Sequence, residues 1–232
     1  MSSALITGAS RGLGLALARE LAGRGWELII DARGKEELGT VAARLGTGVT
    51  AIAGDVADPG HRRELAEAVD RIGSLDLLVN NASVLGPSPL PGLDRYPIDQ
   101  LERVLRINTV APLALAQLLL PNVRAASGTI VNITSDAAVE PYEGWGGYGS
   151  SKAALDQLSN ILGAEQSDIR VYAFDPGDMR TTMHQEAYPG EDISDRPEPE
   201  TVVPALLRLL EEAPPSGRYR AGDLPVAGRV TS

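Results

Sequence analysis

The stretch TGASRGLG, residues 7–14, follows the first apolar run of the chain and opens a segment with helical periodicity. Its three glycines suit three tasks: Gly8 permits a tight turn, Gly12 lets the backbone approach a pyrophosphate, and Gly14 allows the new helix to pack closely. The amino-terminal amides of that helix favour phosphate groups. With 25 glycines in the chain, an ordinary strand-to-helix turn is the alternative, but the position directly after a strand favours a dinucleotide site.

Beyond this loop, short apolar runs alternate with longer stretches of helical periodicity. Strands separated by helices of this length imply right-handed crossovers and a parallel sheet covered on both faces. We therefore predict an α/β fold with a doubly wound parallel sheet of about seven strands, in three layers, formed by one domain over residues 1–232. The predicted strands are 4–7, 27–31, 49–53, 75–80, 129–134, 169–174 and 218–221, and the predicted helices are 12–24, 35–45, 59–72, 98–126, 148–164 and 201–212.

Composition narrows the class of partner. The 31 acidic and 21 basic residues give a formal charge of -10, which repels nucleic acid and anionic membranes, so we expect neither as a partner and a small molecule as the substrate. The chain has no cysteine, which removes thiol catalysis and thiolate metal sites, and no metal is expected. The amino terminus does not resemble a signal peptide and no run approaches the length of a membrane span, so a cytoplasmic location is expected.

The stretch GGYGSSKAAL, residues 146–155, carries one of only two lysines, against nineteen arginines. If Tyr148 opens the helix that follows, its side chain shares a face with that of Lys152, four residues on. The ammonium group would then lower the pKa of the phenol, which is about 10 in free tyrosine, and its remaining donors would hold ribose hydroxyls. The pair is predicted to be an acid/base centre, with a surface Tyr/Lys pair as the alternative.

Two further polar residues belong to the predicted centre. Ser135 ends the predicted fifth strand 13 residues before Tyr148, at the sheet edge where such folds bind ligands, and its hydroxyl can donate to a carbonyl that develops negative charge. Capping of a turn is the alternative role. Asn108 lies four residues before Pro112, which cannot donate the helical hydrogen bond to the Asn108 carbonyl. This carbonyl is expected to be free, with a plain kinked helix as the alternative.

Together these motifs resemble the short-chain dehydrogenase/reductase family, over nearly the whole chain. The spacing T-G-x-x-x-G-x-G is that of its glycine loop, NNAS at residues 80–83 resembles its N-N-A-G with Ser83 in place of glycine, and DPGDMRTTM at residues 175–183 resembles its P-G-x-x-x-T segment. The resemblance implies a Rossmann-like fold, an adenine contact at Asp55 and a nicotinamide carboxamide contact at Thr181. The implied catalytic residues are Asn108, Ser135, Tyr148 and Lys152, and the implied cofactor-binding residues are Gly8, Ser10, Arg11, Gly12, Leu13, Gly14, Arg33, Asp55, Val56, Asn81, Ala82, Tyr148, Lys152, Pro176, Gly177 and Thr181.

The choice of nicotinamide cofactor depends on the end of the second strand, IIDARG. An acid there favours NAD(H) because it accepts from the ribose 2'-OH, whereas an arginine favours NADP(H) because it pairs with the 2'-phosphate. In the family register the acid of NAD users falls at Ala32 and the arginine of many NADP users at Arg33, and Arg11 adds a second guanidinium. We therefore expect NADP(H), with NAD(H) possible if Asp31 takes the ribose and Arg33 is merely solvated.

The resemblance implies hydride transfer between the nicotinamide and a carbonyl or alcohol carbon of a small-molecule substrate. Ser135 would polarise the oxygen and Tyr148 would give or take its proton. Lys152 would tune the tyrosine and hold the ribose, while the main chain of Asn108 would hold a water that links the lysine to solvent. A cofactor-dependent epimerase or dehydratase, with no net redox change, and a non-catalytic NADP(H)-binding sensor remain as alternatives.

The substrate is not specified by these motifs. The acidic, proline-bearing segment 183–200 resembles a substrate lid and is expected to be a mobile surface loop. Aromatic residues that would touch a ligand, or else pack at the surface, are His184, Tyr188, Trp145 and Tyr142. His61, on a charged helix, is expected to be solvated, and Ser150 and Ser151 are expected to cap a turn. A homodimer or homotetramer is possible.

Overall fold

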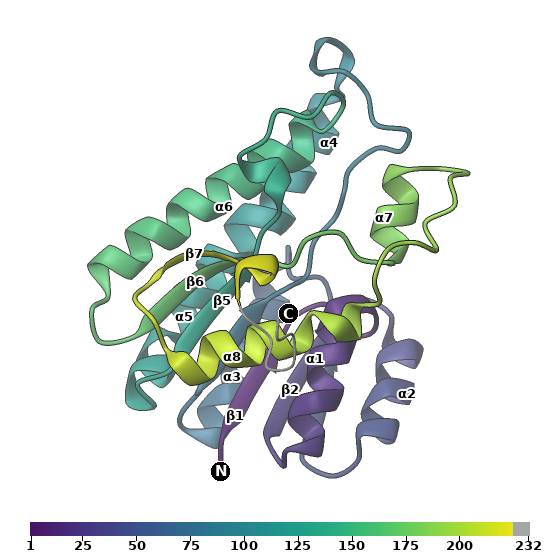
Figure 1. Ribbon diagram of the computed structural model, residues 1–232. Helices are drawn as coiled ribbons and strands as arrows, with labels where there is room; N and C mark the ends of the chain where they lie inside the picture. The colour runs from purple at the N-terminus through teal and green to yellow at the C-terminus, as the bar shows by residue number, and fades with distance from the viewer. Residues whose placement is uncertain (225–232) are drawn as a thin grey trace, which may run out of the picture.

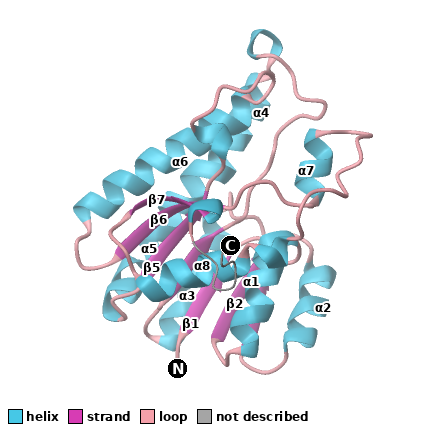
Figure 2. Ribbon diagram, viewed as in Figure 1, coloured by secondary structure: helices cyan, strands magenta, loops and turns pink. Residues whose placement is uncertain are grey.

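A seven-stranded parallel sheet forms the centre of the computed structural model, which describes residues 1–224 (Figures 1 and 2). The strands are β1 (Ser3–Ile6), β2 (Glu27–Ala32), β3 (Val49–Ala53), β4 (Leu77–Asn80), β5 (Thr129–Ile133), β6 (Arg170–Asp175) and β7 (Gly217–Arg220). Their order is β3-β2-β1-β4-β5-β6-β7, and every neighbouring pair is parallel. The predicted α/β fold class is confirmed, while the end of the predicted domain, residues 225–232, lies outside the described residues.

Helices cover both faces of this sheet. The α-helices are α1 (Gly12–Gly23), α2 (Lys35–Leu45), α3 (Pro59–Ile72), α4 (Ile98–Leu105), α5 (Ala111–Ala125), α6 (Gly146–Glu165), α7 (Thr182–Ala187) and α8 (Val203–Glu212). Single turns are η1 (Leu93–Arg95), η3 (Asp136–Ala138), η4 (Pro199–Thr201) and η5 (Ala221–Asp223), and η2 (Arg106–Val110) is π-helical. One core contains α1, α2 and α8, and the other contains α3 and α5.

The alternation of side chains along β2 shows how the two cores are built. Successive residues of a strand point to opposite faces of the sheet. Leu28 and Ile30 pack in the core with α1 and α8, while Ile29 packs in the core with α3 and α5. Because both faces are covered, the strand is apolar almost throughout. Asp31, at the next position on the side of Ile29, therefore faces α3.

One continuous helix runs over Ile98–Ala125, through α4, η2 and α5. By length and composition it could cross a membrane, which corrects the expectation that no run approaches that length. Half of its most apolar window is nevertheless buried inside the fold. Leu115, Leu119 and Val123 lie in the core shared with α3, so this segment occupies the place of a core helix.

The turn from β1 into α1 requires glycine at Gly8 and at Gly14 for two different reasons. Gly8 has a φ of +66°, a conformation that side chains disfavour. A Cβ at Gly14 would lie 2.5 Å from both the Gly8 carbonyl oxygen and Nδ2 of Asn81. Helix α1 therefore reaches this loop only because residue 14 has no side chain.

We expect Gly14→Ala to lower the free energy of unfolding by about 1 to 3 kcal/mol, because the added methyl group has to displace main-chain atoms. Gly23→Ala, at the exposed end of the same helix, is the matched control, since a Cβ there meets no atom within 4 Å and alanine favours a helix. Urea unfolding compares the variants. A Gly14→Ala midpoint equal to that of the wild type would show that the close approach is not needed.

Candidate active site

A cavity of about 970 Å³ opens at the carboxyl ends of the strands, and residues of α7 form part of its lining. Its walls come from the loops that follow β1, β2, β4, β5 and β6, which is where sheets of this kind bind ligands. All predicted site residues line it except Gly14 and Asn108, which are buried behind it. The lining residues among those predicted are Gly8, Ser10, Arg11, Gly12, Leu13, Arg33, Asp55, Val56, Asn81, Ala82, Ser135, Tyr148, Lys152, Pro176, Gly177 and Thr181.

The loop after β4 holds the glycine loop in place. The Thr7 hydroxyl accepts hydrogen bonds from the main-chain N–H groups of Asn81 and Ala82, both at 3.0 Å. Asn81 Nδ2 donates to the carbonyls of Thr7 and Gly8 at 2.9 and 3.0 Å. The side-chain donors of Asn81 are thus engaged within the protein, so its amide positions the glycine loop.

Charged side chains at the end of β2 lie in different environments. Arg33 and Arg11 are exposed at the cavity wall. Asp31 is 1% exposed: one carboxylate oxygen accepts from the Gly8 N–H at 3.0 Å, and the other bonds to His61 Nε2 at 2.6 Å. Asp31 is the acid that could accept from a ribose 2'-OH. Both of its carboxylate oxygens are already engaged within the protein.

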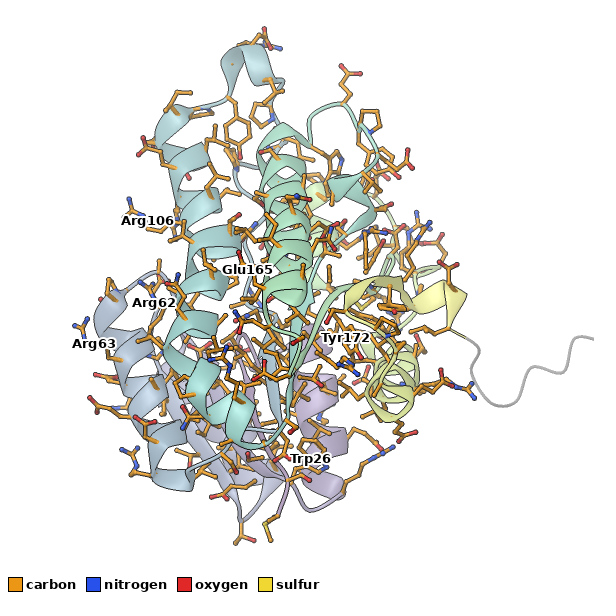
Figure 3. The ribbon with its side chains drawn as sticks, turned by 90° about the vertical axis from the view of Figure 1, so that its left-hand side faces the viewer. Trp26, Arg62, Arg63, Arg106, Glu165 and Tyr172 are labelled. Atoms are coloured by element: carbon orange, nitrogen blue, oxygen red, sulfur yellow. The ribbon has the colours of Figure 1, made fainter. Side chains whose placement is uncertain are left out.

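His61 is buried, contrary to the expectation that it is solvated. It is 4% exposed on α3, and its hydrogen bond to Asp31 raises the pKa of its ring. Arg62 is buried as well and donates to the Val56 carbonyl, whereas Arg63 points away from the fold (Figure 3). The expectation was wrong because the residues next to His61 in the sequence are charged, although its own ring points into the fold.

Helix α6 brings Tyr148 and Lys152 together in its first two turns. Lys152 Nζ lies 5.4 Å from the centre of the Tyr148 ring and donates to the Ile133 carbonyl at 2.7 Å. Burial lowers the pKa of Lys152 to about 8, although the charge of Asp156 acts in the opposite direction. The ammonium is thus held where its charge is costly, which is typical of a functional rather than a surface lysine.

The pKa of the Tyr148 phenol is shifted in the direction opposite to the one expected from the sequence. Burial raises its pKa well above the usual value, and the nearby hydroxyls of Ser135 and Ser83 only partly oppose this shift. The expectation that Lys152 brings the pKa of Tyr148 toward neutrality is therefore wrong for this structure, because desolvation of the phenolate dominates. Tyr148 keeps its proton at neutral pH.

The position of Ser135 is compatible with both predicted roles, donation to a substrate carbonyl and capping of a turn. Its hydroxyl lines the cavity, caps η3 by accepting from the Ala137 N–H at 3.2 Å, and donates to Asp136 Oδ1 at 3.0 Å. The other oxygen of Asp136 accepts from the Tyr142 hydroxyl at 2.9 Å. A ligand carbonyl can receive the Ser135 proton once the hydroxyl turns away from Asp136.

Asn108 lies in the π-helical turn η2, immediately upstream of Pro112, so the helix is disturbed where the proline predicts. Its amide exchanges two hydrogen bonds with the main chain of Val84, both at 2.9 Å, and donates to Ser151 Oγ at 3.0 Å. Ser151 is fully buried and donates to the Tyr148 carbonyl at 2.7 Å, which corrects its expected role as a cap in a turn. Asn108 therefore braces α6 beside the tyrosine.

An aromatic wall closes one side of the cavity. The Trp145 ring lies 5.8 Å from that of Tyr148 and 6.1 Å from that of Tyr188, and the His184 ring lies 5.0 Å from Tyr188. All four line the cavity. The segment 183–200, which was expected to be a loop, begins within helix α7. Thr181 caps the amino terminus of this helix, where its hydroxyl accepts from the His184 N–H at 3.2 Å.

Arg218 was not anticipated from the sequence. It lies on β7, remote in sequence from every motif, and its guanidinium donates to Asp156 at 2.9 Å, to Asp175 at 2.8 Å and to the Ser135 carbonyl at 3.1 Å. It thus joins α6, the end of β6 and the Ser135 loop. No local pattern marks such a residue, because its partners lie 43 to 83 positions away.

Ser83 is a second unanticipated residue, although its departure from the N-N-A-G pattern marks the position. Its hydroxyl oxygen is buried and has no hydrogen-bond partner within residues 1–224, and the residue lines the cavity. It is close enough to Tyr148 to affect the pKa of the phenol.

These groups fit a nicotinamide dinucleotide. Lys152 has three donors and a single acceptor in the described part of the chain, so the others are available to ribose hydroxyls. The glycine loop presents its main chain to the cavity at Gly12, where a Cβ would meet only Thr181, at 3.7 Å. Arg11 and Arg33 stand exposed at the same wall.

Known proteins share this sequence and fold. A sequence model of the short chain dehydrogenase family matches residues 2–192. A benzil reductase ((S)-benzoin forming) from Bacillus subtilis is 31% identical in an alignment that covers 92% of this chain and 95% of the relative. A Shigella flexneri protein solved in complex with NADP superposes with a TM-score of 0.87 at 26% identity, covering 95% of this chain and 97% of that one. An alcohol dehydrogenase from Thermococcus sibiricus, complexed with 5-hydroxy-NADP, has a TM-score of 0.86 at 25% identity, with coverage of 100% and 99%.

We expect Arg218→Gln to lower the free energy of unfolding by about 3 kcal/mol, because it removes the closest cation from the largely buried carboxylates of Asp156 and Asp175 and leaves, within residues 1–224, only Arg220, 3.6 Å from Asp175. Arg208→Gln, which removes an exposed pair with Glu212, is the control and should cost about 0.5 kcal/mol or less. Denaturant unfolding measures the free energy of unfolding of both variants and of the wild type. Equal losses would mean that Arg218 is only another surface arginine.

Proposed function

The chain belongs to the short-chain dehydrogenase family, and from this we propose that it is an NADP(H)-dependent carbonyl reductase with Tyr148 as its proton donor. Membership makes it an oxidoreductase that acts on CH–OH and C=O groups with a nicotinamide cofactor. The observation that carries the proposal is the meeting of Ser135, Tyr148 and Lys152 in one cavity with the glycine loop.

The proposed roles follow from the state of each side chain. When bound, the reduced nicotinamide supplies a hydride to the substrate carbon. Tyr148, whose pKa is raised by burial, holds a proton that it donates to the substrate oxygen, and Ser135 donates a second hydrogen bond to that oxygen. Lys152 holds ribose hydroxyls, and the main-chain carbonyl of Asn108 holds the water from which the tyrosine recovers its proton.

Two arginines support the preference for NADP(H) over NAD(H). Arg33 and Arg11 are exposed at the cavity wall, where a guanidinium can pair with a 2'-phosphate. Asp31 has both oxygens engaged within the protein, so it is poorly placed to accept from a ribose 2'-OH. The similar structures with NADP and 5-hydroxy-NADP support the same choice.

The aromatic wall supports a substrate whose carbonyl group carries an aromatic substituent. The Trp145 ring lies next to Tyr148, the Tyr188 ring lies next to Trp145, and all three residues line the cavity. The Bacillus subtilis relative is named for benzil, an aromatic diketone. We propose that residues 183–200, which begin in α7, act as the substrate lid. We also propose that the whole chain forms one domain.

A panel of benzil, 1-phenyl-1,2-propanedione, acetophenone and benzaldehyde with NADPH, followed by loss of NADPH absorbance, tests the function. We expect turnover of at least one member, and Tyr148→Phe should lower kcat by about a hundredfold or more while leaving the Kd for NADPH nearly unchanged. Tyr219→Phe, on β7, is the matched control and should keep full activity. Tight NADPH binding with no oxidation of NADPH by any carbonyl would favour a sensor or a non-redox enzyme instead.

The pH dependence of cofactor binding reports on Lys152. Its ammonium is present below a pKa of about 8 and is lost above it, so the Kd for NADPH should rise as the pH increases through about 8. Quenching of tryptophan fluorescence between pH 6.5 and 9 measures the Kd. Lys152→Met should bind more weakly but without this step; an identical step in the variant would assign the titration to another group.

A further inference from the structure

An acidic side chain lies where a phosphate is proposed to bind. Asp31 lines the cofactor cavity two residues before Arg33, at the end of the same strand. It is 1% exposed and has no basic partner other than His61 in the described part of the chain. A lone carboxylate at this point would repel the dianionic 2'-phosphate of NADP(H) and weaken the attraction of Arg33.

His61 removes that repulsion in two ways. Its Nε2 bonds to Asp31 Oδ2 at 2.6 Å, and this bond raises the pKa of the ring, which favours the imidazolium form that offsets the carboxylate charge. The bond also keeps the carboxylate turned toward α3, while its other oxygen accepts from the Gly8 N–H at 3.0 Å. The acid is therefore bonded at both oxygens within the protein and held away from the ribose, and its charge is offset when the ring is protonated.

The surroundings fix the His61 ring in this position. A Cβ at Gly54 would lie 2.2 Å from His61 Nδ1, so the ring packs where residue 54 has no side chain. Nδ1 has no hydrogen-bond partner within residues 1–224; the nearest acid, Glu64, is 3.8 Å away and exposed. The adjacent Arg62 turns inward as well, which anchors this turn of α3.

We propose that His61 is a cofactor-selectivity residue, which masks Asp31 so that Arg33 can hold the 2'-phosphate of NADP(H). The proposal rests on the NADP(H) preference proposed above. Without the His61 ring, the bare carboxylate would lie beside the adenosine ribose, where it opposes a 2'-phosphate and can accept from a 2'-OH. Selectivity then depends on a buried pair between β2 and α3 as well as on the exposed arginine.

The test separates the phosphate from the rest of the cofactor by using two fragments, 2',5'-ADP and 5'-AMP, whose Kd values are measured by calorimetry. We expect the wild type to bind 2',5'-ADP more tightly. His61→Gln keeps a neutral donor toward Asp31 but removes the charge, and it should lower the ratio of the two affinities by about tenfold or more. Glu64→Gln is the matched control and should change the ratio less than about twofold.

Asp31→Asn provides the decisive second variant. An asparagine can still accept from the Gly8 N–H and bond to the imidazole, so the glycine loop is kept while the negative charge is removed. Alone it should leave the affinity ratio at least as high as in the wild type. In the His61→Gln background it should restore the ratio, because no carboxylate remains to be masked. The ratio of kcat/KM for NADPH and NADH should follow the same order.

The outcomes distinguish this proposal from the one on which it rests. Equal wild-type affinities for the two fragments would reject the NADP(H) preference itself. A clear wild-type preference that His61→Gln leaves unchanged would reject the role of His61 alone. A loss that Asp31→Asn fails to restore, or a fall caused by Asp31→Asn alone, would mean that the pair acts through packing rather than through charge.

Discussion

The buried ammonium of Lys152 is the constraint on which the catalytic half of the structure depends. It is 2% exposed, and its burial lowers its pKa to about 8. A charge in this position is tolerated only where neighbouring groups offset its desolvation. The Ile133 carbonyl accepts one hydrogen bond, and Asp156 supplies an opposite charge one turn along α6. Arg218 in turn holds Asp156 together with Asp175 and the Ser135 carbonyl, so the lysine, the serine loop and the end of β6 belong to one charge network.

The cofactor half has the same organisation around a different buried pair. Thr7 and Asn81 lock the glycine loop to the end of β4, and Asp31 ties it to β2 and, through His61, to α3. Both halves meet at the carboxyl edge of the sheet because parallel strands all end there. The site is thus assembled from elements whose positions the sheet order already determines, and short polar contacts between neighbouring strands set the fine geometry.

Local patterns predicted most of this arrangement and missed what lies between distant segments. The glycine loop, the Tyr148–Lys152 spacing and the effect of Pro112 are short-range features, and most predicted strand and helix ends lie within two residues of those observed. Arg218 and the burial of His61 depend on contacts across the fold, which no local period reveals. The direction of the pKa shift of Tyr148 depends on the balance between desolvation and charge, and the spacing of two residues does not determine that balance.

Transfer of deuterium from NADPH labelled at C4 to a carbonyl substrate tests the proposed chemistry most directly. The label also separates a reductase from an epimerase or dehydratase, which would return the cofactor unchanged. The proposed mechanism predicts an alcohol product with one deuterium on the carbinol carbon, formed in step with NADPH oxidation and lost in Tyr148→Phe. An alcohol without deuterium, or a product formed while the labelled NADPH stays intact, would contradict it.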